Sequence, residues 1–259
     1  MSGCARCNKM SPTSSMKSAG SSKPRRHLGR RPFVAVTFAM TVDGKVTTRN
    51  YAGVDFTSRE DKARLIRERA VGDAVMVGYG TLERDNVRLG IPNAELRAQR
   101  IERGQAAYPI RVIISNRGRI NPALNIFQTD FSPILIFSTI RMPQKTQREL
   151  REKATLHLSE SPTLDLRWML QQLREDYDVK RIACEGGPAL FRSLLELDLV
   201  DQLNLTIAPF LFGGRKAPTL TGIDPAFLPR SVRCSLTEME VVGQECFLTY
   251  RIKTKRSPK

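Results

Sequence analysis

The sequence is poor in the residues that build metal centres and disulfide frameworks, with two histidines and five cysteines among 259 residues. The cysteines are odd in number and widely spaced, which is typical of reduced thiols in a cytosol rather than of a disulfide framework. Cys4 and Cys7 form a CxxC pair, but a structural zinc needs four ligands and the next candidate, His27, lies twenty residues further along. The composition therefore argues against a bound metal.

Long apolar runs are also absent. None approaches the length of a membrane span, and no compact hydrophobic segment near the start is typical of a signal peptide. We therefore expect a cytoplasmic protein that does not enter the membrane. The Arg- and Ser-rich start also resembles an organelle transit peptide, although its prolines and glycines interrupt an amphipathic helix. An over-extended start codon explains the same segment equally well.

The formal net charge of +16 belongs mainly to the two ends of the chain. Residues 1–31 contain eight Lys or Arg and residues 250–259 contain five, with no acidic residue in either segment. The remainder carries 29 basic and 26 acidic residues. We predict disordered basic tails at 1–31 and 253–259, flanking a single domain over 32–252. Nucleic-acid binding through the tails stays an alternative, but the nearly balanced body argues against it.

Short apolar strands alternate with helical segments after the N-terminal tail. Strands are predicted at Phe33 to Met40, Ala74 to Val77, Arg111 to Ser115, Ile134 to Ser138, Leu156 to Leu158, Val179 to Cys184 and Gln202 to Ile207, and a hairpin at Val232 to Val241 and Glu245 to Lys253. Helices are predicted at 57–71, 94–103, 144–153 and 163–176. The first is opened by a Thr57–Glu60 capping box, and its inner face is expected to carry Ala63, Leu65, Ile66, Ala70 and Val71. The fold class is therefore α/β, a mainly parallel central sheet with helices on both faces and an antiparallel C-terminal hairpin.

The segment from Val179 to Phe191 carries the clearest functional pattern, because a strand ends at Glu185-Gly186-Gly187-Pro188 and a helix follows. Two glycines let the backbone come close to a ligand, and proline suits the first helical position, where its missing N–H costs nothing. The free amides and positive dipole at this helix start can hold a phosphate, with the Glu185 carboxylate beside them. An ordinary strand-to-helix turn is the competing interpretation.

A second segment, Gly78 to Asn86, begins like a dinucleotide fingerprint but has Glu83 where G-x-G-x-x-G requires its third glycine. On a short helix, Thr81 and Asp85 are four residues apart and share a face. A capped and solvated helix is the competing interpretation.

Several predicted strands are followed directly by a glycine or a polar residue. In mainly parallel sheets, ligands bind at the edge formed by the carboxyl ends of the strands. The residues expected at such ends are Asp43, Gly78, Ser115, Ser138 and Glu185.

Five ordered motifs at compatible spacing make the chain similar to a known family. They are Val42-Asp43-Gly44-Lys45 with Thr57-Ser58, Arg69 before Asp73-Ala74-Val75, Gly78 with Thr81 and Asp85-Asn86, Glu185-Gly186-Gly187-Pro188, and Leu199-Val200-Asp201 through Pro209 to Gly213-Gly214. Over roughly Pro32 to Arg251 they resemble the reductase of riboflavin biosynthesis, which also occurs as the C-terminal half of a bifunctional deaminase-reductase. That family has a dihydrofolate-reductase-like fold.

The resemblance implies NADPH-dependent reduction of a ribosylaminopyrimidine 5′-phosphate to its ribitylamino product, by hydride delivery to C1′ of the opened sugar. It implies catalytic roles for Asp85 and Glu185. The implied cofactor contacts are Met40, Gly78, Thr81, Ser115, Gly186, Gly187, Pro188, Ala189 and Leu190. The implied substrate contacts are Thr57, Arg69, Asp85, Leu89 and Glu185, with Arg69 as a bidentate clamp on the substrate phosphate. The family usually forms homodimers, and the terminal hairpin is a natural edge for a second copy.

Two stretches depart from the family pattern. Residues 87–92 lack the usual proline after Asn86 and the arginine that helps hold the substrate phosphate, and residues 48–55 differ from the usual small-residue loop. Arg84 or Arg88 can substitute for that arginine. A paralogue that reduces another pterin-like or small heterocyclic substrate therefore stays an alternative. The zinc deaminase signature of H-x-E with P-C-x-x-C is absent from the sequence, so we expect the reductase alone.

Overall fold

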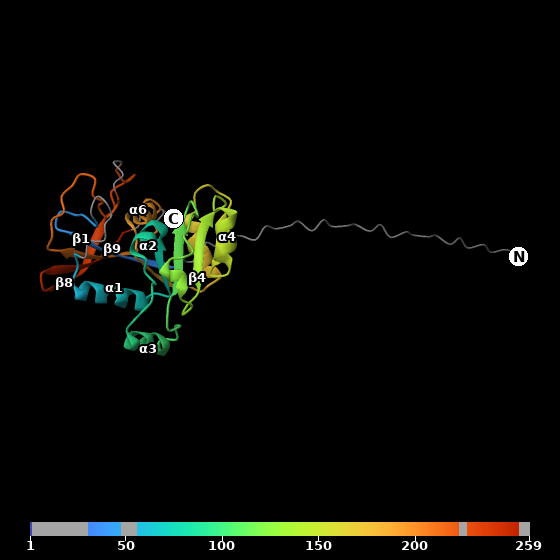
Figure 1. Cartoon of the computed structure of the whole chain (residues 1–259), viewed down its shortest axis with the longest axis horizontal. Coiled ribbons are helices and arrows are strands. Elements are labelled where there is room, and N and C mark those ends of the chain that lie inside the picture. Colours follow the sequence, from blue (N-terminus) through green and yellow to red (C-terminus); the bar gives the residue numbers. More distant parts are fainter. Residues whose placement is uncertain (2–30, 48–55, 223–226, 254–259) are drawn as a thin grey trace.

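The computed structural model describes residues 1, 31–47, 56–222 and 227–253, and within them nine strands form one sheet in the order β5-β4-β3-β2-β6-β1-β7-β9-β8 (Figure 1). The parallel strands are β1 (Phe33–Thr41), β2 (Ala74–Gly78), β3 (Ile110–Ser115), β4 (Ile134–Thr139), β5 (Thr155–Ser159), β6 (Arg181–Cys184) and β7 (Gln202–Ala208). The antiparallel hairpin consists of β8 (Cys234–Val242) and β9 (Glu245–Ile252), and β9 pairs with β7. The predicted mainly parallel sheet with an antiparallel C-terminal hairpin is confirmed.

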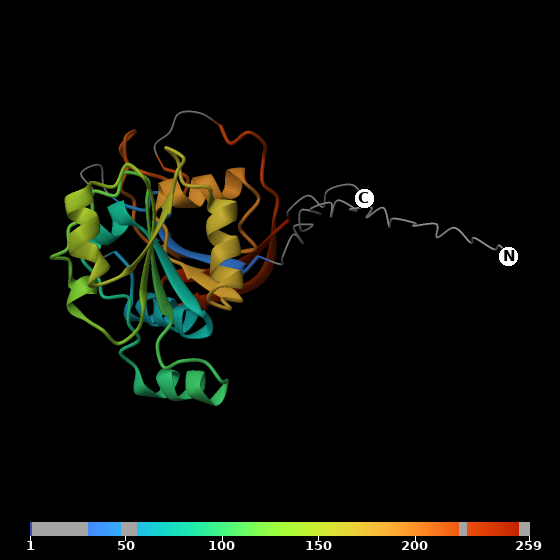
Figure 2. The same ribbon diagram turned by 90° about the vertical axis from the view of Figure 1, so that its right-hand side faces the viewer.

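Helices cover both faces of the sheet. The helices are α1 (Arg59–Val71), α2 (Tyr79–Asp85), α3 (Ala94–Glu102), α4 (Gln144–Arg151), α5 (Leu166–Glu175) and α6 (Pro188–Glu196), with a 3₁₀ turn at Asn125–Gln128. Figure 2 shows α4 on one side of the strands and α5 with α6 on the other, while α3 lies outside these layers beneath the sheet. Apart from Met1 and Arg31, the predicted N-terminal tail lies outside the described residues, and so do Cys4, Cys7, His27 and residues 254–259.

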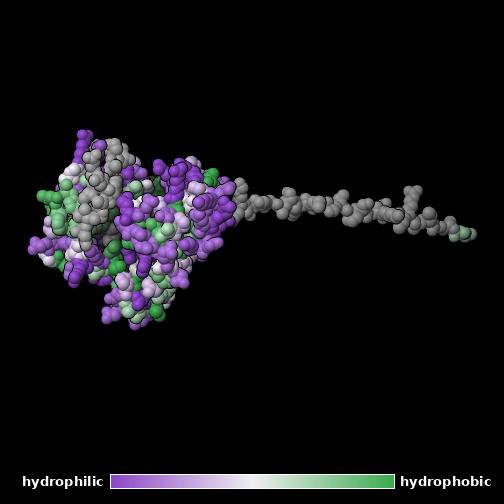
Figure 3. Space-filling model, viewed as in Figure 1, coloured by the Kyte–Doolittle hydropathy of each residue, from purple (hydrophilic) through white to green (hydrophobic). Residues whose placement is uncertain are grey.

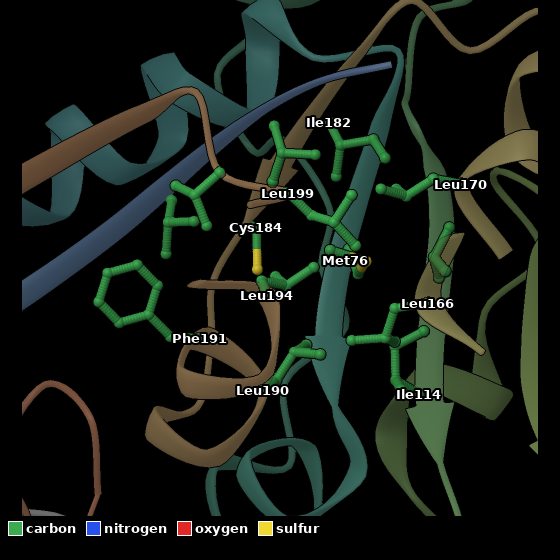
Figure 4. Close-up of a cluster of buried hydrophobic side chains, with 14 of the residues drawn as sticks. Met76, Ile114, Leu166, Leu170, Ile182, Cys184, Leu190, Phe191, Leu194 and Leu199 are labelled. Atoms are coloured by element: carbon green, nitrogen blue, oxygen red, sulfur yellow. The ribbon is translucent and has the colours of Figure 1, made fainter. Parts of the chain in front are cut away.

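Alternate residues of the strands supply two separate hydrophobic cores, because successive strand side chains point to opposite faces. On β2, Met76 packs into the core beneath α5 and α6, whereas Val75 and Val77 pack into the core that includes Leu82 of α2 and Leu150 of α4. Figure 4 shows the first core, where Phe191 and Leu194 of α6 meet β6 and β2. Each fully buried aliphatic side chain contributes roughly 1.5–3 kcal/mol of transfer free energy. This packing anchors α6, whose N-terminus forms part of the site.

The start of α1 differs from the prediction by one residue. Ser58, not Thr57, caps the helix, since its hydroxyl accepts a hydrogen bond from the Asp61 amide at 3.0 Å. The Ser58 hydroxyl also donates to Glu245 of β9 at 2.6 Å, and the Ser58 amide donates to the same carboxylate at 2.8 Å. A contact with a distant strand therefore selects which of two adjacent hydroxyl residues becomes the cap.

The buried face of α1 agrees only in part with the prediction. Ala70 is buried and Leu65 and Ile66 are half-buried, but Ala63 and Val71 are exposed, and Arg64 and Arg69 are buried in their place. The Arg64 guanidinium donates to the carbonyl oxygens of Leu205 at 3.2 Å and Leu248 at 2.9 Å. These bonds satisfy a charged group that could not otherwise be buried. Sequence patterning that places only apolar residues inside could not identify this face.

Candidate active site

The carboxyl ends of β2 and β6 are joined by backbone hydrogen bonds, and this joint is the centre of the site. The amide of Glu185, directly after β6, donates to the carbonyl oxygen of Met76 at 2.9 Å. The amide of Gly78 donates to the carbonyl oxygen of Gly186 at 2.7 Å. Residues that lie more than a hundred positions apart in sequence therefore form one continuous surface at the predicted edge of the sheet.

Close packing of the turn explains both of its glycines. Gly186 has a φ of 82°, and a Cβ atom there would lie 2.7 Å from the Phe38 ring. A Cβ atom on Gly187 would lie 2.3 Å from the Thr81 hydroxyl oxygen. The peptide bond between the two glycines is cis. The glycines therefore bring the turn against β1 and α2, and Pro188 follows as the first residue of α6, as predicted.

Arg69 and Glu185 form a bidentate ion pair at the bottom of the site. The Arg69 Nε donates to one Glu185 oxygen and Nη2 donates to the other at 2.8 Å, while Nη1 donates to the Gly90 carbonyl oxygen at 2.8 Å. The two side chains are only 9% and 10% exposed. The parallel donors that the sequence assigned to a substrate phosphate are thus bound to Glu185, and Arg69 holds this carboxylate in place.

Asp85, the last residue of α2, presents an exposed carboxylate beside this pair. Partial desolvation in the site raises its pKa, the Arg84 guanidinium opposes that shift, and the negative charge of Glu185 adds to it. Among the described residues, no group donates a hydrogen bond to the Asp85 side chain. The two carboxylates therefore occupy contrasting environments, one paired and buried, the other unpaired at the rim.

A cavity of about 320 Å³, called here the carboxylate cleft, contains both acids. Its charged lining residues are Asp61, Arg69, Arg84, Asp85 and Glu185, and Thr57, Thr81, Gly187 and Pro188 also line it. Thr57 lies in the cleft as the sequence predicted for a substrate contact. Arg84, one of the two arginines offered as a substitute for the family's phosphate-binding arginine, lines the cleft, and Asp61 is an additional lining residue that the motifs did not assign.

Two further cavities flank the start of α6 and together form what we call the helix groove. One, of about 730 Å³, is lined by Gly78, Ser115, Ala189 and Leu190, and also by Arg117 and Arg119. The other, of about 700 Å³, is lined by Thr81, Gly187, Pro188 and Arg192. Gly187, Pro188 and Thr81 line both this groove and the carboxylate cleft, so the two spaces meet at the glycine turn.

Leu89 lies elsewhere than the resemblance implied for a substrate contact. It is 1% exposed, because a left-handed backbone (φ 58°) turns it into the core shared with α2 and α4. Met40, implied as a cofactor contact, is half-buried and packs against the core beneath α5 and α6. Asp43 follows the end of β1 as predicted, and its carboxylate accepts hydrogen bonds from the Thr41 hydroxyl and from the amides of Phe212 and Gly213. Its pKa is lowered by the Thr41 hydroxyl and by the amides of Gly213 and Phe212.

Arg117 and Arg119 are the main groove residues that the sequence analysis missed. Both are exposed, and neither has an ion-pair or hydrogen-bond partner among the described residues. The available signal was their position two and four residues after Ser115, at the end of a parallel strand.

The described residues contain no group of three or more His, Cys, Asp or Glu that could hold a metal ion. Nor, within the same ranges, is any helix long and apolar enough to cross a membrane.

Fold and site together define an α/β domain in which a glycine-capped helix N-terminus and a carboxylate cleft lie at the carboxyl edge of the sheet. More particularly, the chain belongs to the RibD C-terminal domain family, whose model matches residues 32–248. This confirms the resemblance found in the sequence, and with it an oxidoreductase of the riboflavin-biosynthesis reductase type.

Two archaeal relatives are similar to the chain over nearly their whole length. The chain is 31% identical to the 2,5-diamino-6-ribosylamino-4(3H)-pyrimidinone 5′-phosphate reductase of Archaeoglobus fulgidus, over 85% of this chain and 98% of that protein. It is 30% identical to the reductase of the same name from Methanothermobacter thermautotrophicus, over 86% and 99%. The fold is shared with a pyrimidine reductase-like protein of Corynebacterium diphtheriae, with a TM-score of 0.75 at 21% identity, over 86% and 93% of the two chains.

Proposed function

We propose that this protein reduces a ribosylaminopyrimidine 5′-phosphate to its ribitylamino form, using NADPH. The observation that carries the proposal is the meeting of the carboxylate cleft and the helix groove at Gly187 and Pro188. This arrangement lets a dinucleotide in the groove reach a substrate beside Glu185 and Asp85. The names of the archaeal relatives supply the substrate class.

The groove has the features that a nicotinamide dinucleotide requires. The first amides of α6 have no partner within the helix and favour a pyrophosphate. Gly78 lines both cavities of the groove, and a Cβ atom there would lie in contact with the turn, 3.6 Å from the Gly187 nitrogen. When bound, this cofactor supplies a hydride. Gly187, Pro188, Ala189 and Leu190 would hold its phosphates.

The proposal includes selectivity for NADPH over NADH. Arg117 and Arg119 line the groove and have no ion-pair partner within the described part of the chain, so they would bind a 2′-phosphate. Replacing either one by Ala is expected to raise the KM for NADPH by about 10- to 100-fold, since one hydrogen bond to a charged group contributes about 1.5–3 kcal/mol. The KM for NADH is expected to change little. Arg151→Ala, on the exposed side of α4, is the control. An equal change for both cofactors would contradict the assignment.

The reaction itself is tested with purified protein, NADPH and either the deaminated or the undeaminated pyrimidine ribosyl phosphate. Loss of absorbance at the dihydronicotinamide band and a product two hydrogens heavier support the proposal. Absence of cofactor oxidation with both compounds refutes it. Comparison of their kcat/KM values identifies which one is the preferred substrate.

A second candidate is reduction of a different heterocyclic substrate. It is favoured by the small number of cations in the cleft. Among the described lining residues, the basic side chains are Arg84 and Arg69, and Arg69 is paired with Glu185. A substrate with a smaller negative charge fits such a cleft better. Turnover of the dephosphorylated nucleoside with a kcat/KM at least equal to that of the phosphate would favour this candidate.

We also propose a homodimer that forms through β8. This edge strand exposes Leu236, Met239 and Val241 by 50% to 66%. Figure 3 shows a hydrophobic area at the same end of the molecule, above the position of β8 in Figure 1. An edge strand with exposed apolar side chains is a template for pairing with a second copy. We expect a dimer by light scattering, and a monomer after Met239→Lys with Val241→Lys. Ile101→Lys, on α3, is the control, and a monomeric wild type would contradict the proposal.

A further inference from the structure

The proposed reduction consumes a proton as well as a hydride, and the two acids of the carboxylate cleft are unequally suited to supply it. We propose that Asp85 is the proton donor, and that Arg69 is a positioning residue that keeps Glu185 as the charged partner. The inference rests on the proposed reaction. It assigns the two carboxylates separate roles.

The chemistry balances with one proton from Asp85. Opening of the sugar breaks the bond between C1′ and the ring oxygen, and the electron pair stays on the oxygen. The oxygen takes the proton of the Asp85 carboxylic acid, which leaves an iminium cation between C1′ and the substrate nitrogen. C1′ then accepts a hydride, and the π electrons of the iminium return to nitrogen. One hydride and one proton enter the product, and Asp85 regains its proton from water.

Glu185 is poorly placed to donate a proton, because both of its carboxylate oxygens face Arg69. Both of its oxygens accept hydrogen bonds from Arg69, and hydrogen bonds to the charged form of an acid favour that form. Protonating Glu185 would break this contact and leave the Arg69 guanidinium, 9% exposed, without its counter-ion. Glu185 is therefore suited to stabilise the iminium cation, which carries the charge that develops during the reaction.

Asp85 has the opposite surroundings. No described group donates a hydrogen bond to its carboxylate, and its position at the rim gives access to water for reprotonation. The charged groups that line the cleft with it are Arg84 on α2, Asp61 and Arg69 on α1, and Glu185 after β6. Desolvation and Glu185 raise the Asp85 pKa against the effect of Arg84. One acid bound by an arginine and a second acid open to water is an arrangement that suits separate charged and proton-donating roles.

The test combines a pH profile with direct titration. Since the protonated acid is the active form, kcat/KM should fall as pH rises through the Asp85 pKa. Asp85→Asn should lower kcat by about 10²- to 10⁴-fold, the usual contribution of a general acid, and abolish that pH dependence. The Kd for NADPH, measured by fluorescence, should not change. Carboxyl ¹³C NMR of the protein should show the Asp85 pKa rising in Arg84→Gln and falling in Glu185→Gln. Asp130→Asn, at the opposite end of the sheet, is the control.

The outcomes separate this inference from the proposed function. A wild type that oxidises no cofactor with either pyrimidine refutes the function. A wild type that turns over while Asp85→Asn keeps both its rate and its pH dependence overturns the inference alone. Loss of the pH dependence in Asp61→Asn instead of Asp85→Asn also overturns it, because Asp61 is the third acid that lines the cleft. The NMR titration is read on folded protein and needs no turnover.

Discussion

Glu185→Gln is expected to lower kcat by about 10²- to 10³-fold, the usual cost of removing one preorganised electrostatic contact to a developing charge. The substitution keeps the shape of the side chain but removes the charge that faces the cleft. It also leaves the buried Arg69 without its counter-ion, so the free energy of unfolding should fall by about 3–5 kcal/mol. Urea denaturation followed by circular dichroism measures the second effect, and cofactor oxidation measures the first.

Arg69→Met distinguishes the two effects. Alone, it should destabilise the protein by a similar amount, because Glu185 is then the unpaired buried charge. Combined with Glu185→Gln, it should recover part of the stability, since no buried charge remains unpaired, but none of the rate. The control is Glu149→Gln, which removes an ion pair with Lys145 at the surface. The Lys145 side chain is 83% exposed and that of Glu149 is 41% exposed, so the free energy of unfolding should change by less than about 0.5 kcal/mol. Full activity in the stabilised double variant would show that the Glu185 charge is not used in the reaction.

The location of the site was predictable because it depends on topology. Short apolar strands end at Gly78 and at Ser115, and a third ends just before Glu185. The carboxyl ends of parallel strands lie at one edge of a sheet. Neither their exact pairing nor the order of the strands was needed for that expectation. The same reasoning could have identified Arg117 and Arg119, which follow Ser115 in the sequence.

The pairing of charges inside the site was not predictable. Arg69 and Glu185 lie 116 positions apart, and an arginine on a helix with many charged residues gives no sign that it is buried. Leu89 is similar, because its direction depends on a left-handed backbone at a leucine, which few such residues adopt. In both cases tertiary packing overrides the local preference. The interpretation of Arg69 therefore changes from a phosphate ligand to the residue that positions Glu185.

Gly187→Ala tests whether position 187 must be glycine because it packs against α2. The new Cβ atom would lie 2.3 Å from the Thr81 hydroxyl oxygen, so we expect a loss of about 1–3 kcal/mol in unfolding free energy, typical of overpacking. The Kd for NADPH should rise as well, because Thr81 and Gly187 both line the helix groove. Urea denaturation and fluorescence titration measure the two effects.

The stability cost of Gly187→Ala should be compared between the wild type and the Thr81→Ala variant. Thr81→Ala removes the clashing oxygen, and the Thr81 Cβ then lies 3.7 Å from the added atom, which is ordinary contact. Gly187→Ala should therefore cost much less stability in this background than in the wild type, a coupling that only a direct contact produces. Gly80→Ala is the stability control, since its Cβ would meet only the Arg84 guanidinium at 3.8 Å and alanine favours a helix by about 1 kcal/mol over glycine. Equal losses in the two backgrounds would mean that the turn requires glycine for a reason other than its contact with Thr81.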